Sequence, residues 1–397
     1  MKKEEKKQNV IDLKYKVVWK IVLTLVRPYL KIFTNYSYSK PIKLPEPSVI
    51  LANHNTDYDT LLLASCFNNQ TYFIASENCF RKGLKSKLLT SNFGLISKIK
   101  GASDTLSVMK AIRTLREGKN VCIFPEGGRS FNGITSPIKI ATGKFVKVSQ
   151  ASLVTIRLSG GYMKIPRWGF GKRSGKWSGK IINIYSPEQL KNMSAEEITS
   201  CINDDLYENA YETQKINPVH YKGKNLALGM ECALSVCPSC KSIGQLKTQK
   251  DTIFCQKCGL KTQINDLGYF TPDFKFNNPT EWDLWQEDFY KNYITEFTDN
   301  TKEIIFDQDV CLRKFNSEHQ TFELGRGRFS LYKDRFCFKP ENNSEINLMI
   351  ENIPDASVFS RSNLNFSDKD GFHYELYADR LINVRKYLSC WEYLRNQ

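Results

Sequence analysis

The chain has 397 residues, of which 41% are hydrophobic and 25% are charged. This balance is typical of a folded protein and excludes a predominantly disordered chain, and the length favours about two or three domains. The net charge of +15 indicates an anionic partner, for which phosphate-bearing lipid surfaces and nucleic acid both qualify.

A basic segment opens the chain as MKKEEKK and leads into an apolar stretch, YKVVWKIVLTLVRP. The uncharged run between residues 20 and 27 is too short for a membrane span, which needs roughly twenty apolar residues, and it is too short and too late for a signal peptide. An amphipathic helix with Trp19, Leu23 and Val26 on its apolar face fits a membrane interface, and Pro28 is expected to bend the chain at its end. Alternatively, this helix packs on its own domain, and both roles can hold.

From residue 48 onward, short apolar runs alternate with amphipathic segments. Strands are expected at Ser48–Ala52, Thr71–Ala75, Leu95–Ile99, Val121–Phe124, Ala151–Leu158 and Ile181–Tyr185, and helices at Tyr58–Cys66, Leu84–Asn92 and Ser103–Glu117. A capping box, SAEE from Ser194, opens a helix that runs to about Ile216 and closes the domain. The alternation predicts an α/β domain, a mixed sheet with helices on both faces.

Two polar blocks follow two of these strands. The block NHNTDYD places His54 and Asp59 just after Ser48–Ala52, and FPEGGRS, about seventy residues later, places Glu126 after Val121–Phe124. Function in such sheets lies where strands end, so we expect the two blocks to meet at one edge. A histidine and a nearby carboxylate can act as a base and the group that orients it, and a substrate would then supply the nucleophilic hydroxyl.

The order N-H-x-x-x-x-D followed by F-P-E-G-x-R-S resembles the glycerolipid acyltransferases. The longer segment KGASDTLSVMKAIRTLREGKNVCIFPEGGRS is similar to a bacterial branch of 1-acyl-glycerol-3-phosphate acyltransferases. Residues from about 17 to about 217 fit the family layout. The resemblance implies transfer of an acyl chain from a coenzyme A or acyl carrier protein thioester to the free hydroxyl of a lysophospholipid. It implies 1-acyl-glycerol-3-phosphate as the acceptor and phosphatidic acid as the product.

In this interpretation His54 removes the proton as the hydroxyl attacks the thioester, and Asp59 holds the imidazole tautomer and stabilises the resulting cation. The alternative for His54 is a turn histidine that satisfies a structural hydrogen bond. The resemblance and the charge pattern together predict which residues bind the acceptor and stabilise the developing oxyanion. These residues are Glu126, Gly127, Gly128, Arg129 and Ser130, with Lys98 and Lys100 as further cations.

Three positions depart from the residues that are usual in the motifs of this family. Lys100 stands where arginine is usual, Gly128 stands where threonine is commoner, and Thr155 replaces a proline. Lysine keeps the charge of arginine but loses its bidentate geometry, which leaves another lyso-lipid or hydroxyl acceptor open. None of the departures touches His54 or Asp59.

Twelve cysteines are present, and four of them form two C-x-x-C knuckles with fourteen intervening residues: Cys237, Cys240, Cys255 and Cys258. Knuckles on a hairpin of Gly244–Gln249 and Thr252–Phe254 place four thiolates around one zinc ion, as in a zinc ribbon. A closed four-thiolate shell indicates a structural metal. The remaining cysteines are interpreted as small core residues, and reduced thiols imply the cytosol.

Beyond the ribbon, Pro279 and Thr280 start a helix whose aromatic stripe (Trp282, Trp285, Phe289, Tyr293) is expected to dock the ribbon onto a neighbour. Strands are then expected at Asp309–Phe315, Thr321–Leu324, Arg328–Tyr332, Arg335–Phe338 and His373–Tyr377, followed by an amphipathic helix, Arg380–Arg395. This pattern resembles a pleckstrin-homology-like barrel. Lipid-headgroup binding and a structural or partner-binding role both stay open.

These elements predict a basic membrane-interface segment (1–34), an acyltransferase domain (35–217), a zinc ribbon (230–265), an aromatic helical linker (266–300) and a β-rich domain ending in a helix (301–397). We expect a peripheral enzyme without a transmembrane span, bound to anionic lipids on the cytoplasmic face of the cell membrane. The competing class is a zinc-ribbon nucleic-acid-binding protein. It does not explain the order of the two motif blocks, so no nucleic acid is expected as a partner. A pseudo-enzyme that only binds lipid is a third interpretation, against which the presence of both His54 and Asp59 argues.

Overall fold

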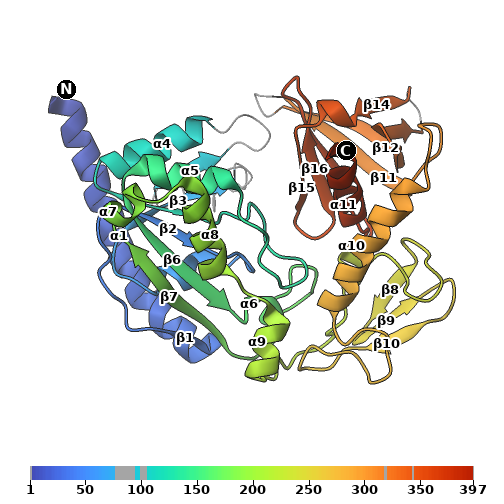
Figure 1. The fold of residues 1–397 in the computed structure, drawn as a ribbon, viewed down its shortest axis with the longest axis horizontal. Helices are drawn as coiled ribbons and strands as arrows, with labels where there is room; N and C mark the ends of the chain where they lie inside the picture. The colour runs from blue at the N-terminus through green and yellow to red at the C-terminus, as the bar shows by residue number, and fades with distance from the viewer. Residues whose placement is uncertain (1, 77–93, 99–104, 317–319, 342–343, 397) are drawn as a thin grey trace. The chain divides into compact units, whose positions relative to one another are not determined.

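The computed structural model describes residues 2–76, 94–98, 105–316, 320–341 and 344–396 (Figure 1). The chain forms two compact units. The first unit comprises Met1–Pro166 and Ser174–Tyr221, and the second comprises Arg167–Arg173 and Lys222–Gln397. The short segment 167–173 therefore belongs to the second unit although its neighbours in sequence belong to the first.

A seven-stranded mixed sheet forms the centre of the first unit. Its strands are β1 (Tyr36–Tyr38), β2 (Ser48–Ala52), β3 (Thr71–Ser76), β4 (Ile96–Lys98), β5 (Asn120–Ile123), β6 (Ser152–Ser159) and β7 (Trp177–Tyr185), in the order β1-β7-β6-β2-β5-β3-β4. Strands β6, β2, β5, β3 and β4 pair in parallel, and β7 pairs antiparallel to β6. The expected strands are confirmed with small changes in their ends.

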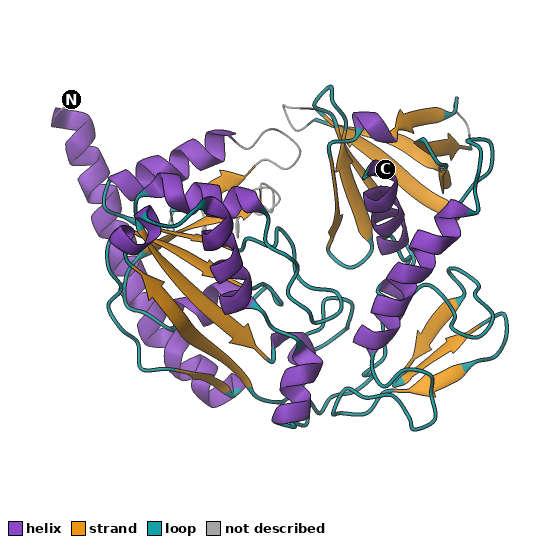
Figure 2. Ribbon diagram, in the orientation of Figure 1, coloured by secondary structure: helices purple, strands orange, loops and turns teal. Residues whose placement is uncertain are grey.

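Helices cover both faces of this sheet (Figure 2). The helices are α1 (Lys2–Thr34), α2 (Asp59–Ala64), α4 (Thr105–Arg116), α5 (Ile140–Ser149), α6 (Gly161–Lys164), α7 (Pro187–Lys191), α8 (Ala195–Leu206) and α9 (Ala210–Ile216). Successive residues of β2 point to opposite faces, so Ile50 packs with α1 and α2, whereas Val49 and Leu51 pack with α4, α5 and α8. The predicted α/β architecture is confirmed.

Two helix predictions in this unit need correction. The helix expected from Ser194 to about Ile216 is two helices, because Tyr207 leaves the helical conformation and the Asn209 side chain caps α9 by accepting from the Tyr211 and Glu212 amides. Helix α1 continues through Pro28 to Thr34. The helix expected at Leu84–Asn92 lies outside the described residues.

The second unit combines a small three-stranded sheet with a larger antiparallel one. The small sheet contains β8 (Leu246–Gln249), β9 (Thr252–Cys255) and β10 (Lys261–Gln263), preceded by a 3-10 turn, η2 (Met230–Cys232), and followed by α10 (Pro279–Thr295). Trp282 of α10 is buried and donates through Nε1 to the Val236 carbonyl at 2.9 Å, so α10 packs on the ribbon segment. Trp285, Phe289 and Tyr293 of the expected stripe are only half-buried, because Gln286 and Tyr290 share the buried face with Trp282.

The larger sheet has seven antiparallel strands in the order β14-β13-β12-β11-β17-β16-β15. Its elements are β11 (Ile305–Phe315), β12 (Thr321–Leu331), β13 (Arg335–Pro340), β14 (Ile346–Met349), a 3-10 turn η3 (Ile350–Asn352), β15 (Asp355–Phe359), β16 (Asn363–Ser367), β17 (His373–Tyr377) and the final helix α11 (Arg385–Arg395). The β-rich character predicted for this region is confirmed.

Two boundaries in this region were predicted wrongly. The segments Thr321–Leu324 and Arg328–Tyr332 form one strand, β12, because Gly325 and Gly327 lie within it rather than in a turn. A Cβ at Gly327 would lie 2.1 Å from the Lys339 carbonyl oxygen, so glycine there allows close approach of β13. The last helix begins at Arg385 rather than at Arg380.

Candidate active site

The two polar blocks meet at one edge of the first sheet. Strands β2 and β5 are parallel neighbours, with Leu51 opposite Ile123, so the turns after them leave the sheet on the same side. The Ser130 amide donates to the His54 carbonyl at 3.0 Å, which joins the two turns directly. The convergence that the sequence predicted is therefore present.

His54 and Asp59 form a hydrogen-bonded pair, with Nδ1 of the ring 2.9 Å from Oδ2 of the carboxylate. Asp59 is fully buried, and its Oδ2 also accepts from the backbone amides of Asn55 and Thr56 at 2.5 and 2.8 Å. The Thr56 hydroxyl donates to Oδ1 at 2.6 Å. These bonds fix the carboxylate, and a neutral His54 then carries its proton on Nδ1 and keeps Nε2 as the basic nitrogen.

The His54 ring is held from one side and remains accessible. It stacks on the Phe124 ring with centroids 4.4 Å apart and planes 21° apart. Its side chain is 24% exposed, whereas that of Asp59 is not exposed at all. This combination of an oriented, partly accessible imidazole and a buried acceptor is the geometry that a general base requires.

Glu126 links the two turns through its carboxylate. Oε1 accepts from the His54 amide at 2.6 Å, and Oε2 accepts from the Ser136 amide at 2.8 Å. Burial raises the pKa of Glu126 to about 8, against the lowering effect of these two backbone hydrogen bonds, and the Asp59 charge raises it further. Both oxygens therefore bond to the chain itself, so the carboxylate fixes the backbone of His54.

Arg129 and Asp57 connect the same two blocks by an ion pair, with Nη1 2.9 Å from Oδ2. The Arg129 side chain is 17% exposed and that of Asp57 is 82% exposed. The arginine thus reaches the turn that follows His54, where it pairs with a carboxylate open to solvent.

The remaining residues of FPEGGRS shape the turn. Gly127 has φ +73°, a conformation that favours glycine, and a Cβ added there would meet nothing within 4 Å. Its amide donates weakly to the Phe124 carbonyl at 3.3 Å. Ser130 is buried, and its hydroxyl accepts from the Gly133 amide and donates to the Ile134 carbonyl. Gly128 lies between Gly127 and Arg129 in the same loop and is half-buried.

Lys98 and Lys100 are the two lysines predicted for this site. Lys98 ends β4, where its backbone pairs with Ser76 of β3 at the same edge of the sheet as His54 and Glu126. Lys100 lies outside the described residues. The sequence alone therefore supports the proposed role of both side chains.

Several residues of this site were not singled out from the sequence. Asp57 and Thr56 lie inside the first block and are the partners of Arg129 and Asp59. Asn53, just before His54, is buried and bridges the backbone of Leu158, accepting from its amide at 2.7 Å and donating to its carbonyl at 2.8 Å. Only their position within the block could have indicated these residues from the sequence. Each forms its hydrogen bond or ion pair with a partner that only the folded structure reveals.

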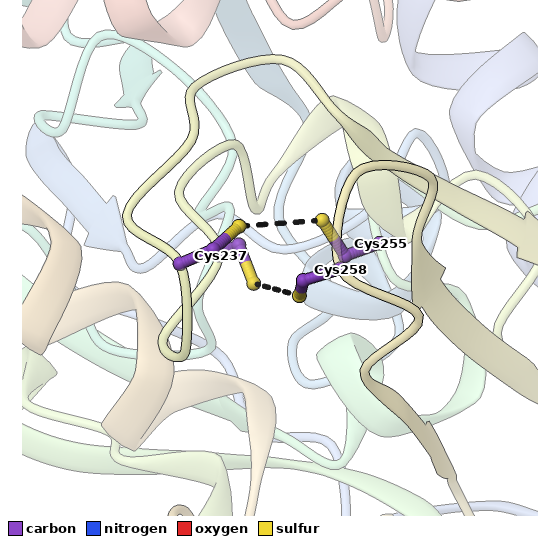
Figure 3. Close-up of side chains that lie close together, drawn as sticks. Cys237, Cys255 and Cys258 are labelled. Atoms are coloured by element: carbon purple, nitrogen blue, oxygen red, sulfur yellow. Dashed lines mark hydrogen bonds between the residues drawn. The ribbon is translucent and has the colours of Figure 1, made fainter.

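The four cysteines of the two knuckles lie together in the second unit (Figure 3). Their sulfur atoms all lie within 4.8 Å of one another, with Cys237 3.6 Å from Cys258 and Cys240 3.8 Å from Cys255. Four thiolates bound tetrahedrally at 2.3 Å from zinc lie about 3.8 Å apart, so the donor set fits this ion. Hydrogen bonding from Ser242 lowers the pKa of the Cys240 thiol to about 6, which favours the thiolate that a metal needs.

Comparison with known proteins finds a family match within the first unit. Residues 34–159 match the family model described as Acyltransferase, and this segment contains both blocks, so the resemblance is confirmed for an acyltransferase domain. The crystal structure of the 1-acyl-sn-glycerophosphate acyltransferase PlsC from Thermotoga maritima is 18% identical with a TM-score of 0.44, covering 51% of this chain and 81% of that chain. A chain of the 8S snRNP assembly intermediate is 12% identical with a TM-score of 0.21, covering 25% of this chain and 85% of that chain. No curated protein sequence matches.

Proposed function

Because residues 34–159 carry an acyltransferase domain, we propose that the protein transfers an acyl chain from a thioester to the free hydroxyl of a lysophospholipid. The observation that carries this proposal is the His54–Asp59 pair at the sheet edge where the FPEGGRS turn also lies. His54 Nε2 takes the hydroxyl proton while the hydroxyl oxygen bonds to the thioester carbon. The thiolate then leaves and recovers a proton, which gives an ester and a free thiol.

The acceptor proposed first is 1-acyl-glycerol-3-phosphate, with phosphatidic acid as the product. Arg129 supports it, because a guanidinium matches a phosphate group and its present partner, Asp57, is a solvent-exposed carboxylate that a phosphate can replace. We also propose, from the sequence alone, that Lys98 and Lys100 add positive charge for the acceptor. Glu126 serves this site by holding the His54 and Ser136 backbones, and backbone amides of the 127–128 turn are the proposed oxyanion donors.

Helix α1 supports association with a membrane surface. Its exposed large apolar side chains recur along the helix as Leu13, Val17, Ile21, Leu25, Tyr29, Ile32 and Phe33. Trp19, Leu23 and Leu30 of the same helix are buried in the first unit, so the helix anchors to its domain with one face and presents apolar residues with another. Within the described residues, no helix combines the length and apolar character needed to span a bilayer. We propose peripheral binding to anionic lipid through this helix.

The four-cysteine cluster is proposed to hold one structural zinc ion, which supplies folding stability to the ribbon. Such a site needs reduced cysteines, and this supports a location on the cytoplasmic face of the membrane. The strand order of the larger sheet and its C-terminal helix support a pleckstrin-homology-like domain over 301–397. Its role is not deduced from its fold.

The acyl-transfer proposal is tested with purified protein, lysophosphatidic acid and either acyl-coenzyme A or acyl carrier protein thioester, with products separated by thin-layer chromatography. Formation of phosphatidic acid by the wild type, and its loss in His54→Ala, is the expected result. Equal use of a monoacylglycerol, which lacks the phosphate, would show that the acceptor is not specifically a lysophosphatidic acid and belongs to another class of hydroxyl compound. Absence of any new ester with both donors and several lyso-lipids would overturn the proposal.

A further inference from the structure

A cavity of about 880 Å³ lies within the second unit, which contains neither of the two motif blocks. Part of its wall comes from the two cysteine knuckles, because residues 241–245 follow Cys240 and residues 256 and 257 lie between Cys255 and Cys258. The rest comes from β8, the end of α10, the start of β11 and the region where α11 begins. Cavities of roughly 300 to 1,000 Å³ are typical of small-molecule sites, so the size suits a small ligand.

Hydrogen bonds between residues outside the lining join the elements that form this wall. The Asn383 side chain, just before α11, donates to the Glu231 carbonyl of η2 at 3.0 Å. The Ser389 hydroxyl of α11 donates to the Glu287 carboxylate of α10 at 2.8 Å. The cavity is therefore built into the folded second unit.

Positive charge dominates the wall of the cavity. Five lining residues are cationic and one, Asp307, is acidic. Lys241 and Lys257 adjoin the knuckles, where a zinc ion with four thiolates would carry a net negative charge that these two lysines offset. The three cations that remain are Lys247, Arg380 and Lys386.

Two of these three cations have no carboxylate partner. Lys386 is 3% exposed, and its Nζ lies 2.8 Å from Oδ2 of Asp307, so the one acidic side chain of the wall already has its counter-ion. Arg380 donates to the Gln308 carbonyl at 2.7 Å, and neither Arg380 nor Lys247 forms an ion pair within the described residues. A phosphate monoester supplies roughly 1.5 to 2 negative charges, which matches these two cations.

Two aromatic rings also line the cavity. Phe306, near the start of β11, is 46% exposed, and the Arg328 guanidinium lies 3.6 Å from the centre of its ring. Tyr293 of α10 stacks on Phe289, with centroids 5.5 Å apart and planes 14° apart. A neighbouring side chain thus supports each ring, and supported aromatic rings in a positively charged groove are suited to stacking with a nucleobase.

A phosphate monoester joined to a planar base is a mononucleotide. We infer that this cavity binds a mononucleotide, with Lys247 and Arg380 as the cations that meet its phosphate and Phe306 as the ring that meets its base. The residues proposed for acyl transfer belong to the first unit, so this is a second site on the chain.

The test is calorimetry on the full-length chain with the four ribonucleoside monophosphates, their nucleosides and inorganic phosphate. Lys247→Gln and Arg380→Gln each remove one of the two cations. Lys261→Gln, at an exposed position of β10, makes the same change of charge outside the cavity and is the matched control. Phe306→Leu removes the ring but keeps an apolar side chain.

At least one monophosphate should bind, and its nucleoside and inorganic phosphate should each bind roughly tenfold more weakly or worse. Lys247→Gln and Arg380→Gln should each weaken nucleotide binding roughly tenfold, whereas Lys261→Gln should bind as the wild type does. Phe306→Leu should weaken nucleotide binding by about the same factor and leave the binding of inorganic phosphate unchanged. Melting temperatures identify a variant that fails to fold, and Arg380→Gln then decides alone because Arg380 is exposed.

Unchanged nucleotide binding in folded Arg380→Gln would overturn the site, as would the absence of binding by all four monophosphates. Inorganic phosphate that binds as tightly as the nucleotide would overturn the assignment of a base-binding ring. Binding of a single-stranded RNA oligonucleotide without binding of any mononucleotide would replace the small-molecule site with a nucleic-acid surface.

Discussion

Arg129 and Asp57 are ion-paired across 72 positions of sequence, with Nη1 2.9 Å from Oδ2. The pair connects the turn that carries the proposed phosphate-binding arginine with the turn that carries the proposed base. A substrate phosphate at Arg129 would displace a carboxylate that is itself 82% exposed, so the exchange costs little desolvation. The ion pair therefore joins a largely buried arginine of one turn to an exposed carboxylate of the other.

Replacing Arg129 by alanine should weaken use of the acceptor more than use of the thioester. A hydrogen bond to a charged group contributes roughly 1.5 to 3 kcal/mol, so the specificity constant for lysophosphatidic acid should fall by about one to two orders of magnitude. Steady-state kinetics with each substrate varied in turn measures this difference. Arg113→Ala, at a side chain that is 83% exposed and pairs with Glu117, is the control and should behave as the wild type. An equal loss for both substrates would contradict the assignment.

His54→Ala should lose acyl transfer by about two to four orders of magnitude, because it removes the proposed general base. Its fold and zinc content should be unchanged, since the ring is partly exposed and packs mainly on Phe124. Turnover in a coupled thiol-release assay and far-UV circular dichroism measure the two effects. His220→Ala, outside both motif blocks, serves as the control. Retention of more than about a tenth of the wild-type rate would remove His54 from the mechanism.

The raised pKa of Glu126 predicts a dependence of stability on pH. Its value is about 8 in the folded chain and ordinarily 4.5, so between these values the folded state holds a proton that the unfolded state has released. The contribution of this group to the free energy of unfolding is complete below pH 4.5 and is lost as the pH rises toward 8. Glu126→Gln cannot ionise and should lack this decline.

Urea unfolding of the wild type and Glu126→Gln across that range measures the difference. The gap between their free energies of unfolding should shift in favour of the glutamine variant as the pH rises. A constant gap would show that Glu126 titrates near its ordinary pKa.

The four-cysteine cluster should bind one zinc ion per chain. Structural zinc binding in small modules is worth on the order of 10 kcal/mol, so Cys237→Ser should expose the segment around residues 236–260 to protease. Metal analysis and limited proteolysis measure both effects, and Cys311→Ser, a half-buried cysteine outside the cluster, is the control. Chelation should harm stability more than acyl transfer, because a four-thiolate shell leaves no open position for chemistry. Protein that is free of zinc as purified, with a disulfide at these positions, would contradict the site.

The sequence by itself determined the features that depend on short-range patterns. Alternating apolar runs indicated the parallel strands β2, β3 and β5, because strand and helix periodicity is local. The knuckle spacing identified the four cysteines whose sulfur atoms cluster, since each C-x-x-C turn fixes two thiols close together. The spacing within NHNTDYD likewise placed His54 beside Asp59.

Tertiary structure decided the features that depend on which distant segments meet. The sequence around Gly327 of β12 predicted a turn, whereas in the fold this glycine allows the close approach of Lys339. The hydrogen bonds of the two Glu126 carboxylate oxygens to the backbone amides of His54 and Ser136 depend on this convergence, and no local pattern predicted them. The buried Nε1 donor of Trp19, which has no acceptor among the described residues, could be recognised only after folding, because burial and the lack of an acceptor are properties of the whole surrounding shell rather than of any stretch of sequence.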